Sequence, residues 1–357
     1  MKHCTWGKFV CQKESNLTHT SPIATNMTHE HRPTPSQRLI PPLLALVLLV
    51  GAGLRLYNLR WDLGTFPHPD ERSTLLFYAP TIRFPKDPAD WLDPRKSPLN
   101  PFWDTQTGRR RSYTYGHFPL YLLVATGDLL HRLATPARAL NLSPATVAFF
   151  RQANTGLGYA VVGRALVALF DTLSIYLVFL IARRLYGPWA GLLAAAFSAF
   201  AVLHIQLAHF FAVDPISTTF VLLTLYASIR MLDEPATGWA TLAGVGVGLA
   251  VSSKFSALPV ALAPATAAWF LWRRPVAGES APPADRFNRA FHLLAMAAIV
   301  SFLTFAVTSP FVLLDFDNFR QAVLKEQGDM VSGVADLPFT RQYRNTPAYL
   351  YFIEQQV

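Results

Sequence analysis

Two adjacent carboxylates, Asp70 and Glu71, follow a histidine and two prolines in the stretch PHPDE, directly after the first long apolar run. When a carboxylate is partly removed from water and lies beside a second one, its pKa shifts from the usual value. Such a carboxylate suits a general base or a metal ligand. The same stretch also fits a helix start, because Pro69 suits the first helical position and acids interact favourably with the helix dipole there. The residues alone leave both interpretations open.

A further acid, Asp214, precedes a proline in the stretch HFFAVDPIST and fits either a helix cap or a second acid in a centre with Asp70. Lys254 marks a break between two apolar runs in the stretch SSKFSALP. Its ammonium group is either solvated at this break or available to neutralise a phosphate. These two residues are therefore candidates for a site that several loops build together.

Arg164 and Asp171 lie inside one apolar run, seven residues apart and so on one helical face. Ionisable groups at membrane depth are costly and usually face a helix bundle or a polar cavity. The two are too far apart to pair with each other, so we expect each to have another partner. Arg164 lies near the end of its run, where it either holds an anionic headgroup bidentately or forms a structural pair with another helix.

The composition places the chain among membrane proteins, since 52% of its 357 residues are hydrophobic and only 15% are charged. Soluble domains carry about 25% charged residues. The net charge of +9 then indicates basic loops beside anionic membrane lipids rather than nucleic-acid binding. Cys4 and Cys11 form neither a disulfide framework nor a metal site, and no zinc-protease, P-loop or hydrolase motif occurs.

The apolar runs predict an all-α polytopic fold of about seven transmembrane helices. Between the first and second runs lies a large loop, residues 59–158. Its stretch His117–Leu133 is short, contains Asp128 and ends in basic residues, so it is expected to lie in the membrane interface. The predicted spans are 39–59, 159–182, 189–208, 216–231, 239–251, 258–272 and 291–308.

Short basic loops, with Arg183 and Arg184 in one and Arg273 and Arg274 in another, predict which ends are cytoplasmic. With seven spans the polar tail 1–38, which is expected to be disordered, is cytoplasmic as well. The large loop and the segment 310–357 then lie outside. The unusual polar residues collect on this outer side, namely Asp70, Glu71, Asp214, Lys254 and Asp315.

Several landmarks occur in order: HPDE after the first span, YGHFPLYLL, VGRALVALFDTLSIYLVFLIARRLYGPWAGLLAAAFSA, an acid in AHFFAVDP, GLAVSSKFSAL and TSPFVLLDF. With them, the chain from about Leu39 to Asp315 resembles the GT-C membrane glycosyltransferases. The likeness is to the protein O-mannosyltransferase-like and aminoarabinose-transferase-like group, glycosyltransferase families 39 and 83. The resemblance implies an all-helical module over 39–309, with interfacial helices in the large first outer loop.

The resemblance implies transfer of a hexosyl or pentosyl group from a polyprenyl-phosphate donor to a protein, lipid or glycan acceptor, at the outer face of the plasma (inner) membrane. Asp70 would be the general base, with Glu71 assisting or orienting it and Asp214 as the second acid. Arg164, Lys254 or both would contact the donor phosphate, together with His209, which stands where many relatives have an arginine. No cofactor is certain, and a divalent metal stays an open option.

Relatives generally continue with more spans, so the segment 310–357 is expected to begin a truncated C-terminal region, and the activity of the chain is open. Two other functions remain. One is a non-catalytic membrane scaffold derived from such an enzyme. The other is a transporter, for which only Asp171 lies deep enough, since transport sites lie near the membrane midplane.

Overall fold

The computed structural model describes residues 37–274 and 282–336, together with Pro338, Thr340, Arg341, Thr346 and Leu350. The prediction of a disordered tail over 1–38 lies outside the described residues up to position 36, as does most of 337–357. The tail up to Arg38 forms a unit separate from Leu39–Val357. Only the second unit positions the candidate residues.

Most of the described residues of this unit are helical, and the two strands among them have two residues each, which confirms the predicted all-α polytopic membrane fold. Trp103 of β1 pairs with Arg110 of β2 in an antiparallel ladder. The helices and strands are α1 (Ile40–Leu56), α2 (Pro69–Ser73), β1 (Trp103–Asp104), β2 (Arg109–Arg110), α3 (Phe118–Arg132), α4 (Ala134–Ala139), α5 (Pro144–Gln152), α6 (Gly156–Tyr186), α7 (Pro188–Phe200), α8 (Val202–Ala208), α9 (Val213–Asp233), α10 (Thr237–Ser253), α11 (Leu262–Arg273), α12 (Pro283–Thr308), α13 (Pro310–Leu314), α14 (Phe316–Phe319) and α15 (Glu326–Val331).

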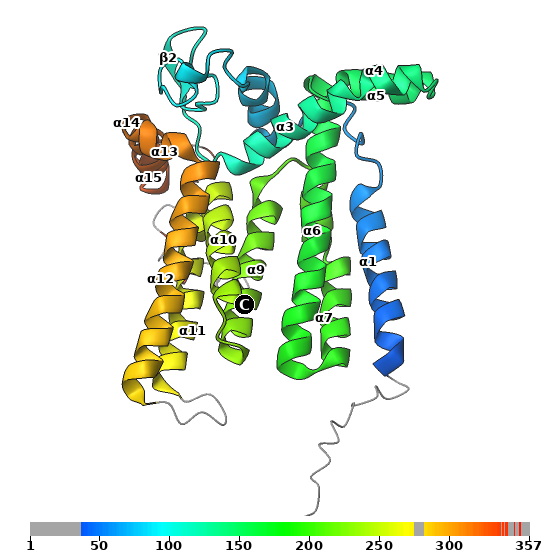
Figure 1. Cartoon of the computed structure of the whole chain (residues 1–357). Coiled ribbons are helices and arrows are strands. Elements are labelled where there is room, and N and C mark those ends of the chain that lie inside the picture. Colours follow the sequence, from blue (N-terminus) through cyan, green and yellow to red (C-terminus); the bar gives the residue numbers. More distant parts are fainter. Residues whose placement is uncertain are drawn as a thin grey trace, which may run out of the picture. The chain divides into compact units, whose positions relative to one another are not determined.

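All seven predicted spans are helical, and they run side by side in Figure 1. Four helices within the described residues are long and apolar enough to cross a membrane: α6, α9, α12 and the continuous segment Phe255–Arg273, which contains α11. The pair α7 and α8, bent by 55°, would be a fifth span. Helices α1 and α10 have 17 residues each, the lower limit of about 17–25 for a span. The count of seven therefore stays a prediction.

Helix α10 packs closely against α9 and α12 because its glycines leave room for the neighbouring backbones. A Cβ atom at Gly244 would come within 2.5 Å of the Ala297 carbonyl oxygen, and one at Gly246 within 2.4 Å of Thr224 Oγ1. Small residues allow this approach in membranes, where packing rather than a hydrophobic driving force holds helices together. The glycines of α10 therefore permit its close packing.

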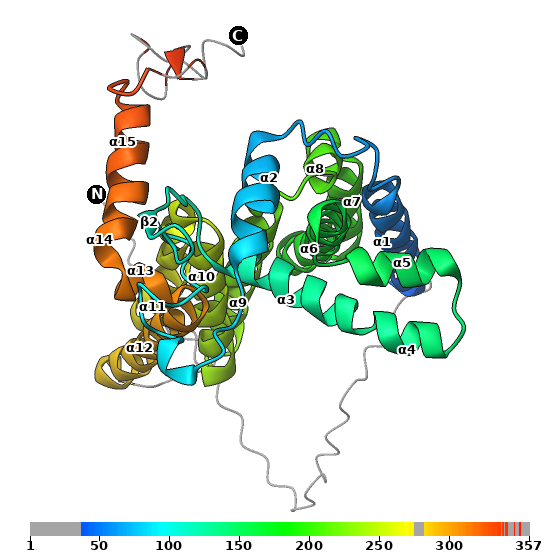
Figure 2. The ribbon, with the colours of Figure 1, turned by 90° about the horizontal axis from the view of Figure 1, so that it is seen from above.

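Helices α3, α4 and α5 lie across one end of the spanning helices, which we call the covered end (Figures 1 and 2). The predicted interfacial helix over 117–133 is α3, and it has this transverse orientation. Its start is fixed to α10, because the Gly116 N–H donates to the Ser253 carbonyl oxygen at 3.3 Å. A Cβ atom at Gly116 would lie 2.0 Å from the Ser252 carbonyl oxygen, so only glycine permits this approach.

Candidate active site

Asp70 and Glu71 occupy the first turn of α2, with Pro69 at the first helical position, as expected for a helix start. Successive helical residues point about 100° apart, so the two carboxylates enter different surroundings. The Asp70 side chain is half-buried, whereas Glu71 is completely buried. The helix start therefore separates the pair into one reachable acid and one internal acid.

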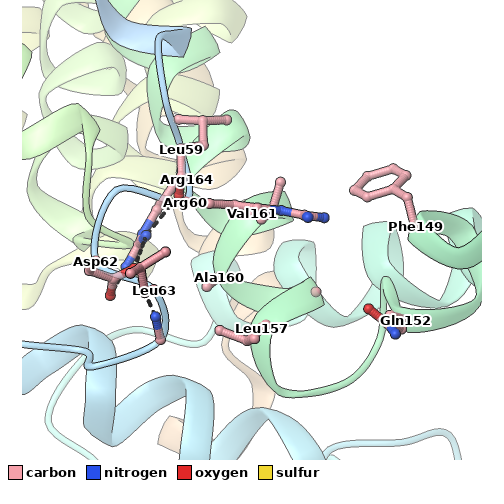
Figure 3. Close-up of a pocket in the computed structure, with 12 residues that line it drawn as sticks. Leu59, Arg60, Asp62, Leu63, Phe149, Gln152, Leu157, Ala160, Val161 and Arg164 are labelled. Carbon is pink, nitrogen blue, oxygen red and sulfur yellow. Dashed lines mark hydrogen bonds and ion pairs between the residues drawn. The ribbon is translucent and has the colours of Figure 1, made fainter. Parts of the chain in front are cut away.

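The internal acid forms a buried cluster with Asp62 and Arg164 (Figure 3 shows its Asp62–Arg164 part). The Arg164 guanidinium donates to Glu71 through Nε and Nη2 at 2.7 and 2.8 Å, and to Asp62 through Nη1 and Nη2 at 2.9 and 2.8 Å. Nη1 also donates to the Leu59 carbonyl oxygen at 2.7 Å. All five N–H groups of Arg164 are thereby used. We call these three residues the Arg164 cluster.

Arg164 therefore does not fit its predicted role as a ligand of the donor phosphate. Its side chain is 1% exposed, and no N–H group is left for another acceptor. The contacts of Arg164 with Asp62 and Glu71 instead fit the alternative of a structural pair. Of the two roles expected for Glu71, orienting its neighbour fits better than assisting in chemistry, since the Phe211 N–H and Arg164 occupy its oxygens.

Asp62 is absent from the residues predicted from sequence, because nothing local marks it as the partner of an arginine 102 residues away. Its carboxylate also accepts the N–H groups of Gly64 and Phe66. Hydrogen bonding from Arg164 lowers the pKa of Asp62 to about 2. Leu63 and Phe66 have positive φ, a conformation that costs a side-chain-bearing residue free energy. The cluster thus holds a strained segment just before Asp70.

The reachable acid Asp70 lies in the same neighbourhood as Asp214, although the two come from distant segments. Both act on Tyr115: burial raises the pKa of the Tyr115 hydroxyl, and the charges of Asp70 and Asp214 raise it further. Both predicted acids therefore lie close enough to Tyr115 for their charges to act on it.

Lys254 joins this group through Asp214, with 2.5 Å between Nζ and Oδ1. Asp214 lies in the first turn of α9, and Lys254 is the residue directly after α10. Their side chains are 45% and 38% exposed. An ammonium group has three N–H donors, so Lys254 keeps donors for a further anion while it holds Asp214. This cation remains accessible, unlike Arg164.

Two other polar residues that the sequence singled out connect separate segments through hydrogen bonds. The ring nitrogens of His209 contact the carbonyl oxygens of Ile205 and Tyr57 at 2.7 and 2.9 Å, so the geometry gives no support to His209 as a phosphate ligand. Asp315 is buried and accepts a hydrogen bond from Asn100 Nδ2 at 2.7 Å. It connects the segment after α12 to the loop between α1 and α6.

Asp171 is buried among partners, as expected for an ionisable residue at its depth. Arg55 Nε lies 2.6 Å from one of its oxygens, and His204 Nδ1 lies 2.8 Å from the other. Arg55 also donates to the carbonyl oxygens of Ser198 and Ala199, near the break between α7 and α8. The expectation that Arg164 and Asp171 each have a different partner is confirmed. The transporter alternative gains no support from this internally paired carboxylate.

An apolar cavity of about 510 Å³ lies between α10, α11 and α12. Val251 and Leu258 line it, and these residues flank Lys254 on either side in the sequence. Because Val251 lies in the last turn of α10 and Leu258 in the segment after it, the cavity reaches the end of α10 that Lys254 follows. No group of three or more His, Cys, Asp or Glu residues that would hold a metal ion is found in the described part of the chain.

Comparison with known proteins gives one match. Residues 155–313 match the model of a family described as dolichyl-phosphate-mannose-protein mannosyltransferase. The matched region runs from the start of α6 into α13 and contains Arg164, Asp214 and Lys254, whereas Asp70 precedes it. No curated protein matches the chain. The family match supports a membrane glycosyltransferase of the mannosyltransferase type.

Proposed function

We propose that the chain transfers a sugar from a polyprenyl-phosphate carrier to a hydroxyl acceptor, with Asp70 as the general base and Lys254 at the donor phosphate. The observation that carries the proposal is the ion pair of Lys254 with Asp214, in a region where the charges of Asp214 and Asp70 both act on Tyr115. A half-buried carboxylate and an accessible cation suit a reaction in which a proton is removed at one point and negative charge develops at another.

The proposed step begins when the Asp70 carboxylate takes the proton of the acceptor hydroxyl. The acceptor oxygen then attacks the anomeric carbon from the face opposite the phosphate, and the bond between that carbon and the phosphate oxygen breaks. The lipid phosphate leaves with the electron pair, and the configuration at the anomeric carbon inverts. Lys254 donates to the phosphate oxygens as their charge grows, with Asp214 holding its ammonium group in position.

The apolar cavity beside Lys254 suits the carrier chain of such a donor. Its walls are apolar side chains of α10, α11 and α12, so an isoprenoid chain would contact them while its phosphate reaches the end of α10. The Arg164 cluster keeps α2, and with it Asp70, in place. In this proposal the active site lies on the outer face of a plasma or inner membrane, and the acceptor is a protein, lipid or glycan.

Substitution of Asp70 tests the proposal. Proteoliposomes that contain the full chain would receive polyprenyl-phosphate mannose labelled in the sugar, together with membrane extract as the source of acceptor. We expect Asp70→Asn to lower transfer at least about 100-fold, the typical contribution of a positioned base, and to leave donor binding intact. Asp87→Asn, which removes an exposed carboxylate from the same loop, is the matched control. Equal transfer by Asp70→Asn and the wild type would refute the assignment.

A further inference from the structure

A second cavity, of about 180 Å³, lies between the segment after α1, the helix α5 and the first turns of α6 (Figure 3). Pockets that enclose a whole small molecule measure about 300–1,000 Å³. This cavity is smaller than that, so a ligand of ordinary size would place only one part inside it and leave the remainder outside. Its lining combines Arg60, the amide of Gln152, the paired Asp62 and Arg164, and apolar side chains that include Leu63, Phe149, Leu157 and Val161.

Arg60 supplies the charge of this cavity. Its side chain is exposed, and within the described residues it has no hydrogen bond or ion pair with another side chain. In Figure 3 it extends from the loop toward Phe149 and Gln152, whereas Asp62 lies on the other side with Arg164. The Asp62 carboxylate is already covered by the Arg164 guanidinium. An anion at Arg60 would thus meet a guanidinium and the exposed amide of Gln152 rather than an unpaired carboxylate.

Exposed apolar side chains form the rim of the same cavity. Leu63 is 88% exposed and Leu157 is 56% exposed. Both line the cavity together with residues of α5, one of the helices that lie across the covered end. Water is a poor environment for these leucines, and a free phosphate ion would gain nothing from them. Acyl chains beside a phosphate headgroup would match both the leucines and Arg60.

We propose that this cavity binds an anionic phospholipid, with the headgroup phosphate at Arg60 and Gln152 and the first part of an acyl chain against Leu63 and Leu157. The site is separate from the apolar cavity beside Lys254, because the two share no lining residue. Its wall includes Asp62 and Arg164, so the bound lipid would brace the Arg164 cluster from outside. The inference does not depend on the proposed transfer reaction.

Photolabelling of the full chain in nanodiscs tests the proposal. The bilayer would be phosphatidylcholine with a small share of phosphatidylglycerol that carries a photoreactive group on one acyl chain. Mass spectrometry of the digested protein would locate the adducts. We expect adducts on α5 and the first turns of α6, displaced by unlabelled phosphatidylglycerol but not by added phosphatidylcholine. Displacement by inorganic phosphate alone would identify a free-anion site and overturn the lipid assignment, as would equal displacement by phosphatidylcholine.

Two variants probe the two halves of the site. Arg60→Gln should lower labelling at this position about fivefold, the factor for about 1 kcal/mol per basic residue near a membrane surface. Val161→Phe should lower it by filling the cavity while Arg60 is kept. Arg138→Gln, which removes an exposed charge from the neighbouring helix α4, should not change it. The proposal would be overturned if either Arg60→Gln or Val161→Phe were labelled to the same extent as the wild type.

Discussion

Arg164 and Lys254 were both expected to meet a donor phosphate, yet the structure places them in opposite surroundings. Arg164 is buried between two carboxylates with every N–H group used, whereas Lys254 shares one carboxylate in a half-exposed pair. A charged side chain that is fully satisfied inside the protein stabilises the fold, and one with spare donors at the surface can bind a ligand. The comparison teaches that the number of free donors, and not the charge, separates the two roles.

The strongest test of this contrast is Arg164→Gln. Removal of the guanidinium leaves Asp62 and Glu71 buried without their partner, and breaking a buried charge pair costs about 3–5 kcal/mol. We expect a corresponding loss of thermal stability in detergent micelles. Arg164→Lys should recover little, because an ammonium group cannot form the bidentate pairs with two carboxylates. If Arg164→Gln kept wild-type stability but bound the donor more weakly, Arg164 would be a ligand of the donor phosphate after all.

The complementary test is Lys254→Gln, for which we expect the opposite pattern. An exposed ion pair contributes about 0–1 kcal/mol, so stability should change little. The affinity for polyprenyl-phosphate mannose should fall about tenfold, as the loss of one charge-assisted hydrogen bond implies. Titration of the donor in proteoliposomes measures this, with Lys86→Gln as the control for an exposed lysine in the large loop. Unchanged donor affinity would remove Lys254 from the proposed site.

Like Arg164, His117 is a buried polar group, and it extends the comparison to a neutral side chain. Burial lowers the pKa of His117 from 6.5 to about 3. Between these values the unfolded chain binds a proton that the folded chain does not, so stability falls as the pH falls below 6.5. The slope is at most about 1.4 kcal/mol per pH unit for one proton. His117→Gln should flatten the dependence of thermal stability on pH between 6.5 and about 4.

His131→Gln is the matched control for this pH effect, because His131 lies on the same helix α3 with an exposed side chain. It should leave the slope unchanged. If His117→Gln keeps the wild-type slope, the acid sensitivity comes from other groups and the contrast between buried and exposed polar residues does not extend to His117.

Much of the fold could be predicted from the sequence because it follows from local properties. Apolar runs of membrane length predicted the positions of the seven helices. The stretch PHPDE fitted a helix start, and the short stretch His117–Leu133 with its basic end predicted an interfacial helix. In each case the information lies within a few turns of chain, where periodicity and capping act.

The partners of the charged residues could not be predicted in this way. Arg164 meets Asp62 and Glu71 across 102 and 93 residues, and Lys254 meets Asp214 across 40. These pairs depend on which loops the packed helices bring to one end, and no local pattern encodes that. The sequence by itself determined an all-helical membrane chain with acids and cations near its loops. Only the tertiary structure decided which of them is buried and satisfied and which remains free to bind.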